Sequence, residues 1–157
     1  MSKSTDPADR CGVYTTLSEV PDQRRLRTCA NEYANRDVWA EFCEDHLFAR
    51  HDSERFQHNA SRAGEHWIAH CRARERHHAL ATPTDGESWC EALLAERAVS
   101  TAYNQYWVWF ERFYTWLQRA RAHPHVYHPV RMAAIAGDAA KEIWQEKIER
   151  GRDGGGA

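Results

Sequence analysis

The sequence predicts an all-α protein, a compact bundle of five or six helices. The first observation is a stripe of large apolar side chains in residues 100–117, at Tyr103, Tyr106, Trp107, Phe110, Phe113, Tyr114 and Leu117. Spacings of three and four residues place these side chains on one face of an α-helix. The second observation is that no segment shows the alternation of apolar and polar residues typical of a strand. We therefore expect an aromatic helix at the centre of the core, with the other helices packed around it.

Composition limits the class of protein. The chain has 157 residues, of which 42% are hydrophobic, so it is long and apolar enough for one domain with a real core. A formal charge of −2 gives no global field that would attract a polyanion or a membrane surface. The five cysteines are scattered without a Cys-x-x-Cys pair, and no apolar run approaches the ~20 residues of a membrane span. We expect free thiols, a cytoplasmic location and no membrane partner.

The first half of the sequence predicts a flexible arm followed by helices. Residues 1–20 are polar and lack periodicity, which predicts a flexible N-terminal arm. A helical start at Pro21 opens an N-terminal helical extension over residues 21–50, with a break near residues 35–37. Asp52 or Ser53 is the expected N-cap of the next helix, which begins a core helical domain over residues 51–130. Gly64 lies within that helix at a cost of about 1 kcal/mol relative to alanine, so we expect close packing or a kink there.

The second half contains the central helix. Thr84 and Glu87 have the spacing of a capping box at the start of an acidic helix. Ser100 and Thr101 stand just before the aromatic stripe, where their hydroxyls could accept hydrogen bonds from the first turn. A link with two prolines ends the central helix. A C-terminal helix over residues 131–150 and a disordered glycine-rich tail over residues 151–157 complete the expected order.

Three features lie in a fixed order between residues 84 and 130. They are an acidic helix start followed by Trp89 and Leu93, the Ser-Thr start of the aromatic helix, and an end reading Phe113-Tyr114-x-Trp116-Leu117 before Pro129-Val130. This order resembles the core-binding domain of tyrosine recombinases and phage-type integrases, and in particular integrase-like proteins of halophilic archaea. The resemblance implies a SAM-like helical fold, double-stranded DNA as partner and a role in the DNA recombination or integration of a mobile element.

Strand cleavage in that family uses a nucleophilic tyrosine, two arginines and a histidine or lysine in a catalytic domain after the link. His128 and Arg131 form a His-x-x-Arg pattern, but no tyrosine follows Tyr127. The expected function is therefore DNA binding without strand cleavage, and the chain is not expected to be an enzyme.

The family's core-binding domain holds duplex DNA mostly through phosphates and helix ends, where basic and hydroxyl side chains serve as donors. The candidate DNA-binding residues in this chain are Arg72, Arg74, Arg76, His77, Ser100, Thr101, Arg112, Arg119, Arg121 and Arg131. The alternative for each of these arginines is a solvated or ion-paired surface role.

Two further functions were weighed. His66 and His70 lie one turn apart with Cys71 adjacent, and three more histidines occupy the link, but no framework of four zinc ligands is visible. We expect neither a metal nor another cofactor. A protein-interaction or regulatory module of a mobile element, which pairs with a recombinase or with itself through the last helix and Trp144, stays open as the alternative.

Overall fold

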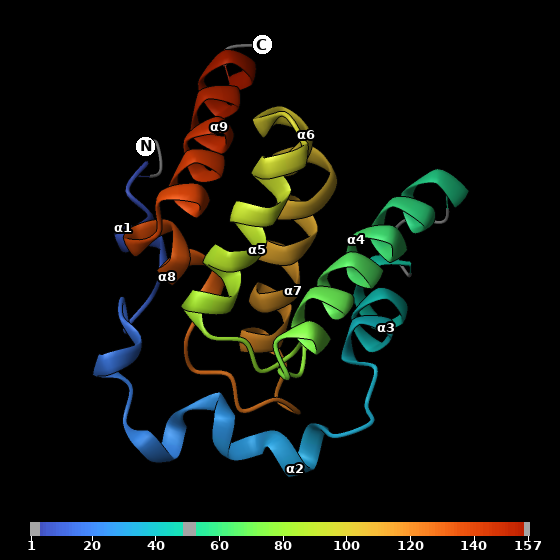
Figure 1. Cartoon of the computed structure of the whole chain (residues 1–157), viewed down its shortest axis with the longest axis vertical. Coiled ribbons are helices and arrows are strands. Elements are labelled where there is room, and N and C mark those ends of the chain that lie inside the picture. The colour runs from blue at the N-terminus through green and yellow to red at the C-terminus, as the bar shows by residue number, and fades with distance from the viewer. Residues whose placement is uncertain (1–3, 49–52, 156–157) are drawn as a thin grey trace.

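Helices and turns make up the chain wherever the structure, a computed structural model, describes it (Figure 1). The described residues are 4–48 and 53–155, with side chains up to residue 151, and no strand occurs among them. The α-helices are α1 (Pro7–Arg10), α2 (Ala30–Tyr33), α3 (Val38–Phe42), α4 (Glu54–Ala73), α5 (Pro83–Glu96), α6 (Val99–Ala102), α7 (Val108–Arg119), α8 (Pro129–Ala136) and α9 (Asp138–Gly155). Two π-helical segments, η4 (Cys43–Leu47) and η5 (Tyr103–Trp107), continue α3 and α6. Short 3-10 turns occupy Leu17–Glu19, Asp22–Arg24 and Leu26–Cys29.

The predicted aromatic helix is the run α6–η5–α7, and it lies at the centre of the core. Every member of the predicted stripe except Tyr103 is buried to 1% exposure or less. Tyr103 is half-buried because it opens the π-helical segment, whose wider i→i+5 turn displaces it from the α-helical stripe. The all-α class and the position of the core are therefore confirmed.

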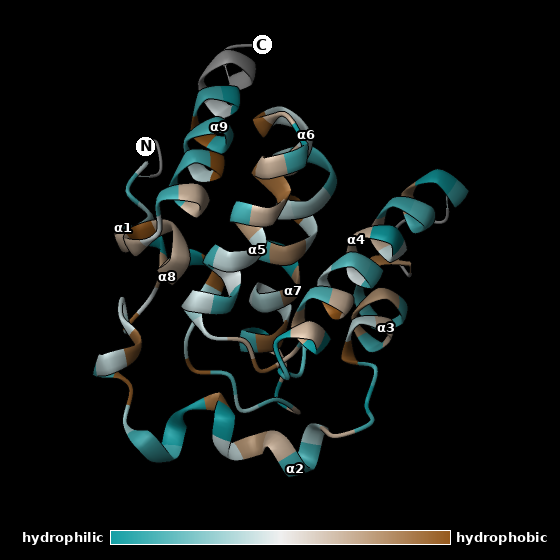
Figure 2. Ribbon diagram, in the orientation of Figure 1, coloured by the Kyte–Doolittle hydropathy of each residue, from teal (hydrophilic) through white to brown (hydrophobic). Residues whose placement is uncertain are grey.

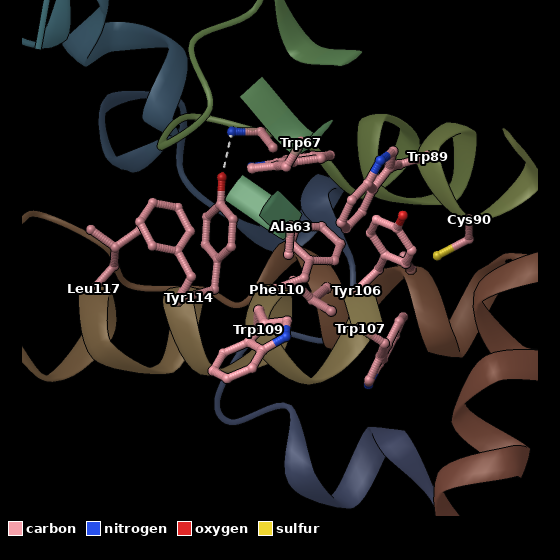
Figure 3. Close-up of a cluster of buried hydrophobic side chains, with 14 of the residues drawn as sticks. Ala63, Trp67, Trp89, Cys90, Tyr106, Trp107, Trp109, Phe110, Tyr114 and Leu117 are labelled. Atoms are coloured by element: carbon pink, nitrogen blue, oxygen red, sulfur yellow. Dashed lines mark hydrogen bonds between the residues drawn. The ribbon is translucent and has the colours of Figure 1, made fainter. Parts of the chain in front are cut away.

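The neighbouring helices pack their own aromatic rings against this stripe (Figure 3). The ring of Phe110 lies 4.4 Å from that of Trp67 on α4 and 4.9 Å from that of Trp89 on α5, between centroids. Phe113 contacts Trp39 of α3 with centroids 4.8 Å apart. Burial of each such ring contributes about 2–3 kcal/mol, so these contacts account for much of the core. Figure 2 shows that hydrophilic residues line the outer turns of α4 and α9.

Tyr114 connects the core to the loop between α4 and α5. Its hydroxyl accepts a hydrogen bond from the backbone N–H of Ala81 at 3.0 Å (Figure 3) and donates one to the carbonyl of His78 at 2.8 Å. Both groups are buried, so this pairing satisfies backbone atoms that would otherwise carry a desolvation cost.

The N-terminal segment differs from the expected flexible arm over the residues that the structure describes. Cys11 and Val20 are 3% and 1% exposed, and α1 packs against α8. Trp144 of α9 donates its indole N–H to the carbonyl of Thr5 at 2.8 Å. Contacts with residues far away in the sequence therefore hold the N-terminal segment against the bundle, although its local sequence pattern is irregular. Trp144 itself is 2% exposed, so it is not available as the exposed contact residue that the interaction hypothesis used.

The last helix differs from the expected continuous helix over residues 131–150. It is divided at Gly137 into α8 and α9, and α9 continues to Gly155, into the predicted tail. Residues 156–157 of that tail lie outside the described residues. The carboxylate of Glu87 accepts hydrogen bonds from the N–H groups of Ala139 and Ala140 at 2.9 and 2.8 Å, so it caps α9 from another helix. A Cβ on Gly137 would collide with the Glu87 side chain, which explains the glycine.

The predicted helix starts at residues 35–37 and 52–53 are confirmed, and the predicted capping box of the acidic helix is wrong. Asp37 and Ser53 are the N-caps of α3 and α4. The capping box of α5 is formed by Thr82 and Asp85, rather than by Thr84 and Glu87, because the Glu87 carboxylate is engaged at α9. No helix among residues 4–48 and 53–155 is both long and apolar enough to cross a membrane.

The predicted close packing at Gly64 is confirmed, and it gives a first test of the fold. A Cβ at Gly64 would collide with the indole of Trp39, whereas one at Gly86 would meet neighbours at an ordinary 3.5 Å. We expect Gly64→Ala to lower the free energy of unfolding by about 1–3 kcal/mol through overpacking. Gly86→Ala is the matched control and should be neutral or stabilising by up to about 1 kcal/mol. Urea unfolding of both variants measures the difference, and equal stability would contradict the packing of α3 on α4.

Candidate nucleic-acid interface

The outer face of α7 forms the floor of an open groove of about 830 Å³. We call it the α7 groove. Its lining residues are His46 and Leu47 of η4, Tyr103 of η5, Val108, Glu111, Arg112, Thr115, Trp116, Arg119 and Ala120 of α7 or its end, Arg131 of α8 and Lys147 of α9. Because an α-helix rises 1.5 Å per residue, the floor between residues 103 and 120 is about 25 Å long. The groove has the length and openness suited to a linear ligand.

Four cations and one carboxylate line the groove. Arg112 and Arg119 are exposed, and the guanidinium of Arg112 lies 5.6 Å from the ring centroid of Trp109. Arg131 and Lys147 are half-buried and both contact Glu111. The lining therefore carries a net positive charge in a chain whose formal charge is −2. Such local charge attracts a polyanion over distances comparable to the Debye length.

Glu111 holds the two inner cations in place. Its carboxylate accepts from Lys147 Nζ at 2.7 Å, from Arg131 Nε at 2.9 Å and from the indole N–H of Trp107 at 3.0 Å. Burial alone would raise the pKa of Glu111, but the positive charges of Lys147 and Arg131 hold it at about 2. Burial also lowers the pKa of Lys147, an effect that Glu111 opposes. Helices α7, α8 and α9 thus meet at one ionic cluster.

His128 positions Arg131 at the start of α8. Its Nδ1 accepts from the backbone N–H of Arg131 at 3.3 Å, so the ring is the N-cap of the helix. Its Nε2 then carries the proton and donates to the hydroxyl of Thr115 at 3.1 Å, and Thr115 donates in turn to the carbonyl of Glu111. The chain of bonds fixes the groove wall against its floor.

Apolar and aromatic side chains lie between these charges. Trp116 is half-buried in the floor, with its ring 5.2 Å from that of His123. Tyr103 and Val108 are also half-buried, and Leu47 closes the side formed by η4. Both π-helical segments of the described residues border this groove, and π-helical turns occur frequently at functional sites.

Three of the predicted DNA-binding residues, Arg112, Arg119 and Arg131, come together in the α7 groove. Arg74 and Arg76 do not join them. Each donates its Nε to a different oxygen of the buried Asp85 carboxylate, at 2.8 and 2.9 Å. Burial would raise the pKa of Asp85, but hydrogen bonds from Thr82 and Arg74 and the charge of Arg76 lower it. These two arginines therefore fasten the end of α4 to the start of α5, as the ion-paired alternative proposed.

Arg72 and His77 lie at a second, smaller hollow of about 560 Å³. Arg72 is exposed, whereas His77 is half-buried with its ring nitrogens bonded to the carbonyl of Arg36 and the N–H of Ala79. Burial lowers the pKa of His77, so its ring is neutral at physiological pH. Arg36 and Arg76 also line this hollow, and the acidic side chains of Asp37 and Glu75 offset two of its three arginines. This site has less local positive charge than the α7 groove.

The remaining candidates contribute little to either hollow. Ser100 and Thr101 are half-buried within α6, whose N-cap is Ala98, so the expected cap by their hydroxyls is wrong. Arg121 is exposed just beyond α7 and lines neither hollow.

Sequence reasoning missed Glu111 and Lys147. Glu111 falls within the aromatic helix, directly after Phe110, and a carboxylate next to a buried ring is a signal that a cation must lie nearby. No pattern identifies that cation as Lys147, because the two residues meet only through the packing of α9 on the central helix.

Comparison of the chain with protein-family models, curated protein sequences and solved structures yields no match. The described part of the chain also contains no group of three or more His, Cys, Asp or Glu side chains placed to hold a metal ion.

Proposed function

We propose that the chain is a DNA-binding helical protein that holds DNA phosphates along the α7 groove and has no strand-cleavage activity of its own. The observation that carries the proposal is the convergence of Arg112, Arg119 and Arg131 on one groove, where Lys147 adds a fourth cation. Arginine offers forked donors that match phosphate oxygens, and phosphate contacts supply most non-specific affinity for DNA. The resemblance to a recombinase core-binding domain favours double-stranded DNA from a mobile element as the partner.

Salt dependence tests the proposal. We expect a labelled random duplex to bind at low salt and to be released as salt rises, with the logarithm of affinity falling linearly against the logarithm of salt concentration. Arg112→Gln combined with Arg119→Gln should weaken binding and reduce that slope by about 1.8, since each phosphate contact contributes about 0.9. Fluorescence anisotropy at several salt concentrations measures both quantities.

The control variant carries the same loss of charge elsewhere. Arg24 and Arg62 are exposed and line neither hollow, so Arg24→Gln with Arg62→Gln should leave the slope nearly unchanged. Equal losses in both double variants would show that only net charge matters. Absence of duplex binding at low salt would refute double-stranded DNA as the partner.

A protein partner is the second candidate, and the apolar part of the groove favours it. Leu47, Val108 and Trp116 could receive the apolar face of a partner helix, while the surrounding cations select one with acidic flanks. A recombinase or a second copy of this chain would be such a partner. Analytical ultracentrifugation of the purified chain tests self-association, and a strict monomer at all concentrations would exclude the second copy.

A further inference from the structure

The α7 groove combines cations with partly exposed aromatic rings, and duplex DNA would contact only the cations. Its lining combines four cations with the half-buried rings of Trp116 and Tyr103. In a duplex the bases are paired and stacked inside the helix, so their faces cannot reach a recessed aromatic ring. An unpaired strand can turn its bases toward the floor while its phosphates remain at the cations.

We propose that the α7 groove is a binding site for single-stranded DNA, in which bases stack on Trp116 and Tyr103 while the phosphates pair with the surrounding arginines and Lys147. This inference rests on the proposed function, and it narrows the ligand from DNA in general to an unpaired strand. Grooves that bind single strands without sequence preference combine these two elements, a positive track for the backbone and aromatic platforms for the bases.

The arrangement of the charges agrees with a strand that follows α7. Arg112 and Arg119 are seven residues apart on one helix, which separates their Cα atoms by about 10 Å along the axis. Trp116 lies between them in sequence and on the same groove floor. Arg131 and Lys147 face them from α8 and α9. A strand in the groove would therefore meet cations on both sides of a ring.

The groove provides stacking surfaces without closing on the ligand. The ring of Trp116 contacts Phe42, Phe113 and His123 with centroid distances of 5.6, 6.5 and 5.2 Å, so its position is fixed by the core before a ligand arrives. A preorganised ring loses little conformational entropy when a base stacks on it. The guanidinium of Arg150 lies over one face of the Tyr103 ring, 5.5 Å from its centroid, so a base would stack on the other face.

Paired binding measurements test the inference. A labelled oligo-dT of about 12 nucleotides, within the site sizes of single-strand-binding grooves, is titrated beside a duplex of equal length at the same salt. We expect the single strand to bind about tenfold more tightly than the duplex. Trp116→Leu should remove that preference and leave the affinity for the duplex unchanged, because it removes stacking and no charge. A tenfold loss is at the low end for removal of one stacking platform.

Variants with matched changes keep the test decisive. Trp116→Phe should retain the preference, and Tyr103→Leu should reduce it. Tyr14→Leu removes a half-buried ring outside the groove and should have no effect. If Trp116→Leu lowers the melting temperature too far, the pair Tyr103→Leu and Tyr14→Leu carries the comparison. Cross-linking of an oligonucleotide that contains 4-thiothymine, mapped by mass spectrometry, should mark peptides of the α7 groove.

The binding measurements distinguish failure of the single-strand inference from failure of the proposed function. Equal affinity for strand and duplex would overturn the single-strand inference and leave DNA binding in place. A preference that survives both Trp116→Leu and Tyr103→Leu would overturn the stacking site. No binding to either nucleic acid would overturn the proposed function as well. If poly-glutamate displaces the strand as effectively as unlabelled DNA of equal charge, the groove is an acidic-peptide site and the inference is wrong.

Discussion

Acidification from about pH 7 to pH 5 should strongly destabilise this protein. The structure buries three histidines whose burial lowers the pKa of the ring far below the ordinary value of about 6.5. The pKa is about 3 for His78, about 4 for His125 and about 3 for His128. Above pH 6.5 these rings are neutral in both the folded and the unfolded chain, so stability is complete. Below pH 6.5 the unfolded chain binds protons that the folded chain does not bind, and stability falls down to about pH 3.

The size of the effect follows from the number of protons. Each group that is protonated only in the unfolded chain lowers the free energy of unfolding by about 1.4 kcal/mol per pH unit. Three groups together give about 4 kcal/mol per pH unit, against a typical total stability of about 5–15 kcal/mol. The low pKa values of Asp85 and Glu111 add further loss only below about pH 4.5, where those carboxylates begin to bind protons in the unfolded chain.

Burial is the main reason why the folded chain does not protonate these rings, and the groups around His78 and His125 show what a charge would meet there. The Nε2 of His78 accepts from the N–H groups of Val38 and Trp39, at 3.1 and 3.2 Å, so a proton on it would face two donors at the start of α3. His125 is 4% exposed, and its Nε2 bonds to the carbonyl of Ala79. The Nδ1 of the same ring is buried without a hydrogen-bond partner in the described part of the chain, where a charge would be poorly solvated.

Urea unfolding between about pH 7.5 and pH 5, followed by circular dichroism, measures the slope. His128→Asn keeps a side chain that caps α8 and removes one titrating ring, so the slope should fall by about 1.4 kcal/mol per pH unit. His58 is exposed on α4, and His58→Asn should leave the slope unchanged. Equal stability at pH 7.5 and pH 5 would contradict the burial of neutral rings.

Much of the helical core could be predicted from the sequence because its signals are local. The aromatic stripe of the central helix, the caps at Asp37 and Ser53 and the tight site at Gly64 depend on spacing, side-chain type or the missing Cβ. An apolar period of 3.6 residues indicates which face of a helix is buried, even when the elements that pack on it are unknown. The displacement of Tyr103 was not predictable in this way, because a π-helical turn departs from that period.

Features made by distant residues could not be predicted. Glu87 caps α9 across more than fifty residues, and this contact accounts for both the capping box at Thr82 and the break at Gly137. The break did have a local signal, since Gly137 before Asp138 is typical of a helix end followed by a new start. The packing of α1 on α8 had no local signal in the sequence.

The candidate site shows the same division. The arginines could be named from the sequence, but their roles depend on which carboxylate each one meets. Arg74 and Arg76 pair with Asp85 and become structural contacts, whereas Arg112 and Arg119 remain exposed in the groove. No signal in the sequence distinguishes the two pairs. Which arginine each carboxylate pairs with is decided by the folded structure, and this pairing determines which cations remain available for a ligand.

Replacing Glu111 by glutamine should lower stability and strengthen DNA binding in the same variant. Glu111→Gln removes the only carboxylate that lines the groove among the described residues, and it leaves Arg131 and Lys147 half-buried without their anion. Loss of one partner from a buried ionic cluster costs about 3–5 kcal/mol, because the remaining charges stay desolvated and repel each other. The partial exposure of Arg131 and Lys147, 24% and 23% of the side chain, places the expected loss near 3 kcal/mol.

Binding should change in the opposite direction for the same reason. The groove gains one unit of positive charge, and Arg131 and Lys147 lose the carboxylate that offsets their charge, so both attract phosphates more strongly. Each additional phosphate contact should steepen the salt dependence of DNA affinity by about 0.9 in the logarithmic slope. Glu142→Gln on the exposed side of α9 makes the same change in net charge outside the groove, and it should alter neither the stability nor the slope.

The combination of effects separates a structural cluster from a functional one. If Glu111→Gln lowers stability and leaves DNA affinity unchanged, the cluster only joins α7, α8 and α9, and the groove is not the DNA site. If stability is unchanged, the ionic contacts with Arg131 and Lys147 contribute nothing to the fold. Lys147→Met in the Glu111→Gln background should restore part of the stability, since an apolar side chain tolerates burial that an unpaired ammonium does not. The same change should reverse the gain in DNA affinity, because the added cation is removed from the groove.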